Sequence, residues 1–132
     1  VQECAYGVLR HFHGLRHRLA TLLARPLRKR DAEIEALLLS GLYQLFQLET
    51  PAHAVVDASA QACRELDRAW ATSLVNASLR NALRRHADYI APTSADPEAY
   101  WQHPRWLIDA IAQAWPADWQ RILTAHSARP PL

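Results

Sequence analysis

Arginine and amide side chains recur at helical spacing in the stretch SLVNASLRNALRR, residues 73–85. Asn76, Arg80 and Arg84 follow one another at steps of four residues, and Arg85 stands beside the last of them. Residues at this spacing share one face of a helix, and guanidinium groups bind phosphate oxygens through paired hydrogen bonds. The stretch therefore fits either a surface for nucleic-acid phosphates or an ordinary solvated helix face. Asn76 also fits a buried amide that bonds a neighbouring loop.

Basic residues are concentrated in two segments of the chain, although the formal net charge is only +2. Residues 1–30 carry seven basic side chains and one acidic, residues 31–63 carry five acidic and no basic, and residues 64–86 carry five basic and two acidic. Such segregation favours binding to a polyanion through local basic surfaces. The candidate phosphate-binding residues are Arg10, Arg16, Arg18, Arg28, Lys29, Arg30, Arg80, Arg84 and Arg85.

The sequence lacks the usual signatures of a catalytic or nucleotide-binding site. With only three glycines it contains neither a G-x-G-x-x-G turn nor a P-loop, and no G-x-S-x-G or Cys-x-x-Cys pattern occurs. His13 and His17 have a spacing that suits a metal ion, but histidines among arginines more often face solvent or phosphate. His53 and Asp57 fit a hydrogen-bonded helix start better than a general base. We therefore expect no catalytic residue, metal ion or cofactor in this chain.

Length and composition limit the chain to one folded domain. It has 132 residues, of which 50% are apolar and 21% are charged, the balance of a folded protein. No apolar run reaches the roughly 20 residues of a membrane-spanning helix, and no signal-peptide pattern is present. Cys4 and Cys63 fall on apolar faces of expected helices, which indicates buried thiols and a reducing cytoplasm.

Hydrophobic periodicity predicts an all-α fold. Apolar residues at steps of three and four predict helices over residues 1–23 with a break at Gly14, over 31–48, over 50–66 and over about 70–85. The 31–48 helix is apolar nearly all round and belongs at the centre of a bundle, whereas ARPLRKRD at 24–31 predicts a loop. Because proline suits the first position of a helix, further starts are predicted at Thr50-Pro51, Asp96-Pro97, His103-Pro104 and Trp115-Pro116.

Four of the five tryptophans cluster in the last third of the chain. Trp101, Trp106, Trp115 and Trp119 could stack on bases, but their spacing beside leucine and isoleucine favours a place in a hydrophobic core. Trp70, before the arginine-bearing stretch, is undecided between these roles.

Several blocks resemble the amino-terminal, NusB-like domain of the Sun/Fmu family of ribosomal RNA cytosine-C5 methyltransferases. They are VQECAYGVLR, GLYQLFQLETPAHAVVDASAQAC, SLVNASLRNALRR, HPRWLIDAIAQAWP and ARPPL, in that order. LVNASLR alone indicates only the wider NusB-like family, and HPRWL with RPPL points to the methyltransferase branch. The resemblance implies a NusB-like helical bundle that binds RNA, with its main bundle at about 1–90 and short helices at 91–132 leading to a methyltransferase domain.

The resemblance also implies partners and a cofactor outside this chain. In the family, the catalytic domain transfers methyl from S-adenosylmethionine to a cytosine of small-subunit ribosomal RNA, and neither the cofactor loop nor the Pro-Cys nucleophile motif occurs here. We therefore expect this chain to bind small-subunit ribosomal RNA, to contact its own methyltransferase domain, and to be inactive alone. The family's first helix is expected to be absent, which would leave an apolar groove exposed to a second copy of the chain.

Two alternatives to this function stay open. The chain could be a free-standing NusB-type antitermination factor, against which HPRWL and RPPL argue. It could also be a helical module that only packs against its own catalytic domain. RNA binding by the isolated domain separates the methyltransferase hypothesis from the second alternative.

Overall fold

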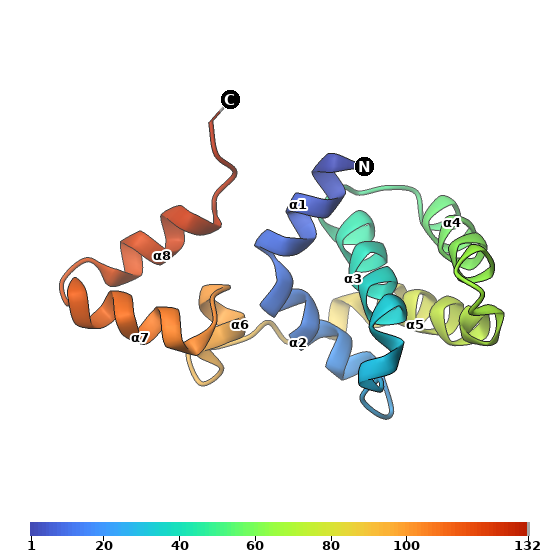
Figure 1. Ribbon diagram of the computed structural model, residues 1–132, viewed down its shortest axis with the longest axis horizontal. Coiled ribbons are helices and arrows are strands. Elements are labelled where there is room, and N and C mark those ends of the chain that lie inside the picture. Colours follow the sequence, from blue (N-terminus) through green and yellow to red (C-terminus); the bar gives the residue numbers. More distant parts are fainter. Residues whose placement is uncertain (132) are drawn as a thin grey trace.

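The computed structural model describes residues 1–131, and within them it contains helices and no strand (Figure 1). The all-α prediction is confirmed. The helices are α1 (Gln2–Arg10), α2 (Phe12–Leu22), α3 (Ala32–Phe46), α4 (Ala52–Glu65), α5 (Thr72–Arg84), α6 (Pro97–Trp101), α7 (Arg105–Ala114) and α8 (Trp119–Ser127). Short 3-10 turns, η1 (Lys29–Asp31), η2 (Ala69–Ala71) and η3 (His86–Asp88), stand between some of them. No described helix has the length and apolar character needed to cross a membrane.

Helix α3 lies at the centre of the main bundle, as its nearly continuous apolar surface predicts. It packs against α1, α2, α4 and α5 (Figure 1). Ile34, Leu38 and Leu42 on α3 are completely buried. Burial of each such side chain stabilises the fold by about 2 kcal/mol. Cys63 on α4 is buried in the same core and Cys4 is half-buried on α1, and both are free thiols.

The break in the first helical region falls at His11 and not at Gly14. His11 takes a non-helical conformation, φ −105° and ψ 16°, between α1 and α2. Gly14 lies inside the first turn of α2, where its N–H donates to the side-chain oxygen of Gln102 at 3.0 Å. The first N–H groups of a helix have no partner within it, so Gln102 supplies one from α6. The prediction of a break at Gly14 was wrong because this partner lies far away in the sequence.

Only one of the four proline-based helix starts is as predicted. Pro97 opens α6, and the Asp96 carboxylate accepts a hydrogen bond from the Ala99 N–H at 3.5 Å. Pro51 and Pro104 instead precede α4 and α7, because their ψ angles of 131° and 149° are extended. Helix α8 begins three residues after Pro116, at Trp119. Proline fixes φ and leaves ψ free, so it marks a boundary without setting the first helical residue.

Helices α6, α7 and α8 enclose a second, smaller hydrophobic cluster beside the main bundle (Figure 1). Ile108, Ile111 and Leu123 are buried there, and the rings of Trp101 and Trp119 meet edge to face at 5.1 Å. The core prediction therefore holds for these two tryptophans. It was wrong for Trp106 and Trp115, which are 70% and 55% exposed.

Besides the contact of α6 with α2, side-chain contacts among the described residues join the cluster of α6–α8 to the main bundle. They include the Gly14–Gln102 hydrogen bond, an ion pair between Arg129 and Glu3 at 3.2 Å, and the approach of His17 to Asp96, the cap of α6, at 3.9 Å. The last residue of the RPPL block, Leu132, lies outside the described residues. Tyr6 and Leu9 on α1 are exposed, and the expected use of an apolar surface by a second copy of the chain stays a prediction.

Candidate nucleic-acid interface

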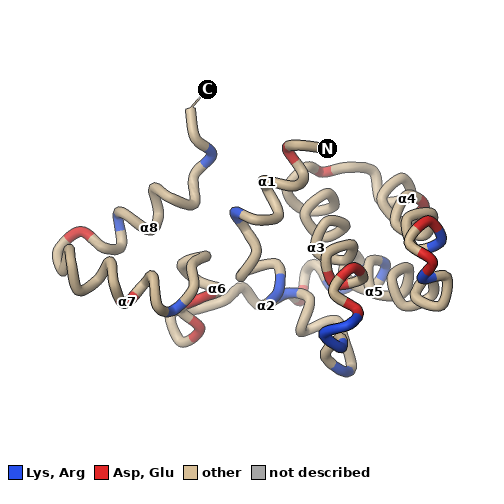
Figure 2. The backbone as a smooth tube through the Cα atoms, viewed as in Figure 1, with Lys and Arg blue, Asp and Glu red and all other residues tan. Residues whose placement is uncertain are grey.

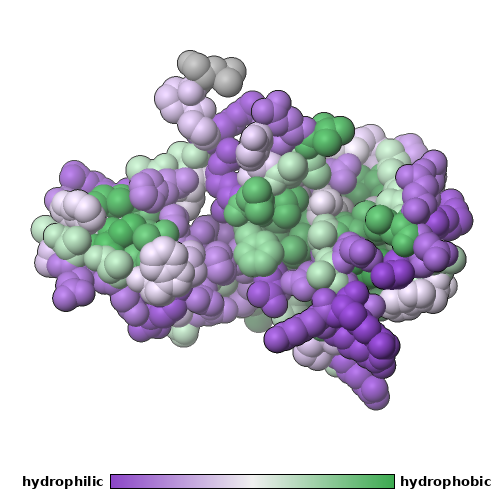
Figure 3. Space-filling view, viewed as in Figure 1, coloured by the Kyte–Doolittle hydropathy of each residue, from purple (hydrophilic) through white to green (hydrophobic). Residues whose placement is uncertain are grey.

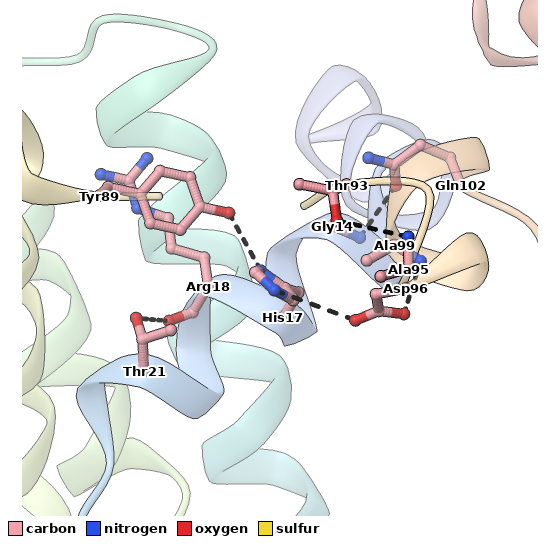
Figure 4. Close-up of polar contacts among 10 residues, drawn as sticks. All are labelled: Gly14, His17, Arg18, Thr21, Tyr89, Thr93, Ala95, Asp96, Ala99 and Gln102. Carbon is pink, nitrogen blue, oxygen red and sulfur yellow. Dashed lines mark hydrogen bonds and ion pairs between the residues drawn. The ribbon is translucent and has the colours of Figure 1, made fainter. Parts of the chain in front are cut away.

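Arg18, one of the expected phosphate contacts, is buried in the fold. Arg18 is 9% exposed, and its guanidinium carbon lies 3.6 Å from the centre of the Phe46 ring. The same carbon lies 4.3 Å from the centre of the Tyr89 ring (Figure 4). One of its terminal nitrogens is 2.9 Å from Nδ1 of His86. Burial lowers the pKa of the Arg18 guanidinium, and nearby Tyr89 partly offsets that shift. These contacts leave Arg18 little surface for a phosphate, in contrast to the expectation.

His17, considered as a metal ligand with His13, holds the chain segment that follows α5. Its ring lies between the Tyr89 hydroxyl, 3.4 Å from Nδ1, and the Asp96 carboxylate, 3.9 Å from Nε2 (Figure 4). Together with Arg18, it fixes the path of residues 86–96 along α2. Among residues 1–131, no three His, Cys, Asp or Glu side chains are grouped closely enough to hold a metal ion.

The arginines at and near the end of α5 are exposed, whereas Val75 and Leu79 of the same helix face the core. Arg84 donates to the side-chain oxygen of Asn81 at 3.3 Å, and Arg85 donates to the backbone oxygen of Thr21, on α2, also at 3.3 Å. Leu79 is completely buried. Arg80 has no ion-pair partner among residues 1–131. The side-chain oxygen of Asn76 is buried, as the buried-amide alternative requires, but it has no hydrogen-bond partner within the described part of the chain.

The loop between α2 and α3 carries the densest group of basic side chains. Arg25, Arg28, Lys29 and Arg30 are all exposed, and none of them forms an ion pair within residues 1–131. Figure 2 shows these basic positions below α3, and Figure 3 shows a hydrophilic corner projecting there. We call residues 25–30 the basic loop. Its cations are free to bind a ligand anion.

The other expected contacts are less available or lie elsewhere. Arg16 on α2 is paired with Glu35 of α3 at 2.8 Å. Arg10 ends α1 and is half-buried, away from the basic loop. The fold therefore groups Arg28, Lys29 and Arg30 at one place and Arg84 and Arg85 at another.

A groove of about 800 Å³ separates the basic loop from the start of α5. We call it the Trp70 groove. It is lined by Leu23, Ala24, Arg25, Pro26, Leu27, Arg28, Arg30, Asp31, Arg68, Trp70 and Leu74. Trp70 is 59% exposed, and Arg68 forms an ion pair with Glu33 at 3.2 Å. Arg25 and Arg68 were not among the residues predicted to bind phosphate, and the role of Trp70 was left open. The signal in the sequence is an arginine and a tryptophan two residues apart, just before α5.

A second cavity of about 430 Å³ lies at the other end of α5, against residues 88–96. Arg85 lines it together with Asp88, Asp96 and the buried Arg18, so its charge is mixed. Thr21 and Leu22 line this cavity, and the chain that follows them, from Leu23, lines the Trp70 groove. The two hollows therefore lie along the same α2–α5 side of the bundle. Helix α5 has 13 residues and is roughly 20 Å long, a span that several nucleotides would cover.

All three glycines, Gly7, Gly14 and Gly41, lie within helices, so they form no loop that could receive S-adenosylmethionine. The described residues therefore do not fit that cofactor.

Two family models and several named proteins match the sequence of this chain. The NusB family model matches residues 1–84, and a model described as "Methyltr_RsmF/B-like, ferredoxin-like domain" matches residues 103–132. Proteins named ribosomal RNA small subunit methyltransferase B are similar over nearly the whole chain. The one from Pseudomonas syringae pv. tomato is 41% identical over 99% of this chain, and a probable one from Coxiella burnetii is 38% identical over 100%. This chain covers 29% and 31% of those two proteins. The matches confirm the resemblance inferred from the sequence blocks.

Proposed function

Since the chain belongs to the NusB family, we propose that it is the RNA-binding domain of a small-subunit ribosomal RNA methyltransferase. It holds the RNA by its phosphates, and a methyltransferase domain of the same protein performs the reaction. Because the chain spans about 30% of the length of its curated relatives, we assign S-adenosylmethionine and the cytosine chemistry to that other domain.

One observation carries the proposal: four cations of the basic loop are exposed and form no ion pair within residues 1–131, and the hollow lined by Arg85 lies on the same α2–α5 side of the bundle. Arginine suits this role because its planar guanidinium binds phosphate oxygens in pairs. Contacts of this kind position an RNA without reading its sequence. The domain should therefore bind many RNA sequences with similar affinity.

Salt dependence tests the phosphate contacts directly. Each phosphate that the protein neutralises releases condensed counterions, so affinity falls as salt rises. If about five or six phosphates of a single strand are contacted, the slope of log K against log salt is roughly −4. A slope near zero would contradict the proposal.

The first experiment is fluorescence anisotropy of this chain with a labelled small-subunit ribosomal RNA hairpin, from low to physiological salt. A variant with Arg80, Arg84 and Arg85 changed to Ala should bind more weakly, with a shallower salt slope. The matched control changes Arg64, Arg105 and Arg121, three exposed arginines on other helices, and removes the same charge.

Equal weakening by both triple variants would mean that only net charge matters, and would remove α5 from the interface. Absence of binding by the unmodified chain at low salt would favour a module that only packs against its catalytic domain.

A further inference from the structure

An exposed tryptophan among unpaired arginines is the least explained feature of the bundle. A tryptophan side chain gains from burial, so exposure of Trp70 at 59% is informative. Trp106 is also exposed, on α7. Next to Trp106, Arg105 is already paired with Asp109 at 3.1 Å.

The Trp70 groove combines charged and apolar lining. Arg25, Arg28 and Arg30 supply positive charge and outnumber the one carboxylate, Asp31. Apolar surface next to the indole comes from Leu23, Pro26, Leu27 and Leu74. A pure polyanion would use only the charge. A nucleotide uses both, because its base is planar and apolar on its faces and its phosphate is anionic. The volume of about 800 Å³ leaves room for a group of that size.

The wall that bears Trp70 is held in place before any ligand binds. The Arg68 side chain pairs with Glu33 of α3 at 3.2 Å, and the Arg68 N–H donates to the backbone oxygen of Cys63 at 2.8 Å. These contacts attach the connection between α4 and α5 to the bundle. A pre-organised wall lowers the entropy cost of binding. Arg68 is thus a positioning residue, and Arg25, Arg28 and Arg30 are the cations that remain free.

We propose that the Trp70 groove binds unpaired RNA nucleotides, with one base stacked on the Trp70 indole and its flanking phosphates held by Arg25, Arg28 and Arg30. This inference rests on the proposed function and adds that the domain prefers single strands. In a duplex the faces of each base are covered by its neighbours, whereas an unpaired base leaves a face open for stacking. The basic loop and Trp70 together therefore select a loop or bulge of the RNA.

The test uses the whole chain and three labelled ligands: a single-stranded RNA hexamer, an abasic hexamer that retains the same number of ribose phosphates, and the same hexamer in a duplex, whose two strands together carry twice that number. The variants are Trp70→Ala, Trp70→Phe and the control Trp106→Ala, which removes another exposed indole, on α7. Circular dichroism checks that each variant is folded.

We expect the unmodified chain to bind the single strand most tightly. Trp70→Ala should weaken that binding about tenfold, within the range of one lost base–aromatic stack, and should leave the abasic ligand unaffected. Trp70→Phe should retain part of the affinity, and Trp106→Ala should match the unmodified chain. A labelled poly-glutamate peptide of the same charge should bind weakly and not respond to Trp70→Ala.

The inference would be overturned by equal affinity of the unmodified chain for the hexamer and the abasic ligand, or by no effect of Trp70→Ala on hexamer binding. Tight binding of poly-glutamate that depends on Trp70 would also overturn it, in favour of an acidic protein partner. If the ribosomal RNA hairpin still binds with a salt slope near −4 in these cases, the proposed function survives and only the stacking site is lost. If neither RNA binds at low salt, both fail.

Discussion

The guanidinium carbon of Arg18 lies 3.6 Å from the centre of the Phe46 ring, so a cation of α2 is packed against an aromatic side chain of α3. Tyr89 and His86, from the segment after α5, contact the same guanidinium. Arg18 therefore joins three parts of the chain that are far apart in sequence. Its role in the fold is structural, and this distinguishes it from the exposed arginines around it.

Arg18→Ala should destabilise the domain by about 2 to 3 kcal/mol, because a desolvated cation–π contact and the hydrogen bond to His86 are lost together. Arg18→Lys keeps the charge but not the planar stacking, so it should lose part of that stability with unchanged RNA affinity. Urea unfolding followed by circular dichroism measures the first effect and anisotropy the second. Full stability of Arg18→Ala with weaker RNA binding would instead make Arg18 a phosphate contact.

Gly7 allows α1 to approach α3 closely. A Cβ atom at Gly7 would overlap the ring of the buried Tyr43, so Gly7→Ala should cost about 1 to 3 kcal/mol despite the better helix propensity of alanine. Gly14→Ala is the comparison. There the new Cβ would meet the flexible end of Gln102, which can move aside with the loss of its one hydrogen bond to the Gly14 N–H. Urea unfolding should rank Gly7→Ala well below Gly14→Ala, and the reverse order would contradict the α1–α3 packing.

Stability should fall as the pH decreases from about 7.5 to 5.5. Burial, with help from Arg10, lowers the pKa of His11 below its ordinary 6.5, and burial is also the largest cause of the lowered pKa of His13. Below pH 6.5 the unfolded chain then binds more protons than the folded one, so the stability present above that pH is progressively lost. The double variant His11→Gln, His13→Gln should flatten the pH dependence of the unfolding free energy. His53→Gln, which replaces an exposed histidine of α4, should keep the original slope, and a double variant with that same slope would refute the assignment.

The helices could be predicted from the sequence because their signals are local. The apolar stripe around Ile34, Leu38 and Leu42 requires a helix whatever it packs against, and its width places it at the centre. The break between α1 and α2 could not be located in the same way. The residue that explains Gly14 is Gln102, 88 positions later. A contact between residues so far apart in sequence does not affect the local spacing of apolar residues from which the helices were predicted.

The candidate interface was only partly predictable for the same reason. Arg18 and Arg16 have similar neighbours in sequence, yet one is buried against aromatic rings and the other is paired on the surface. Trp70 is a candidate binding residue because it lines the same groove as the basic loop, which precedes it by some forty residues. The distribution of charge along the sequence identified the segments in which basic residues are concentrated. Which of their side chains are free depends on tertiary partners.

The two hydrophobic clusters should respond separately to core substitutions. Leu79→Ala removes a completely buried side chain from the main bundle and should destabilise the whole domain by about 2 to 5 kcal/mol. Leu123→Ala opens a comparable cavity among α6, α7 and α8. These helices contact the main bundle mainly through the packing of α6 on α2, the Gly14–Gln102 hydrogen bond and the Arg129–Glu3 ion pair. It should therefore release the Trp101–Trp119 packing, seen in near-ultraviolet circular dichroism, at lower urea than the loss of helix in the main bundle.

The RNA affinity of Leu123→Ala tests whether α6–α8 contribute to the RNA surface. The Trp70 groove, the basic loop and α5 all belong to the main bundle, so folded Leu123→Ala should bind the RNA hairpin with nearly unchanged affinity. Hydrogen exchange would show early loss of protection in α7 and α8 and persistent protection in α3. If one transition instead removed all signals together and RNA binding fell with it, the clusters would form one cooperative unit, and α6–α8 would contribute to the RNA surface.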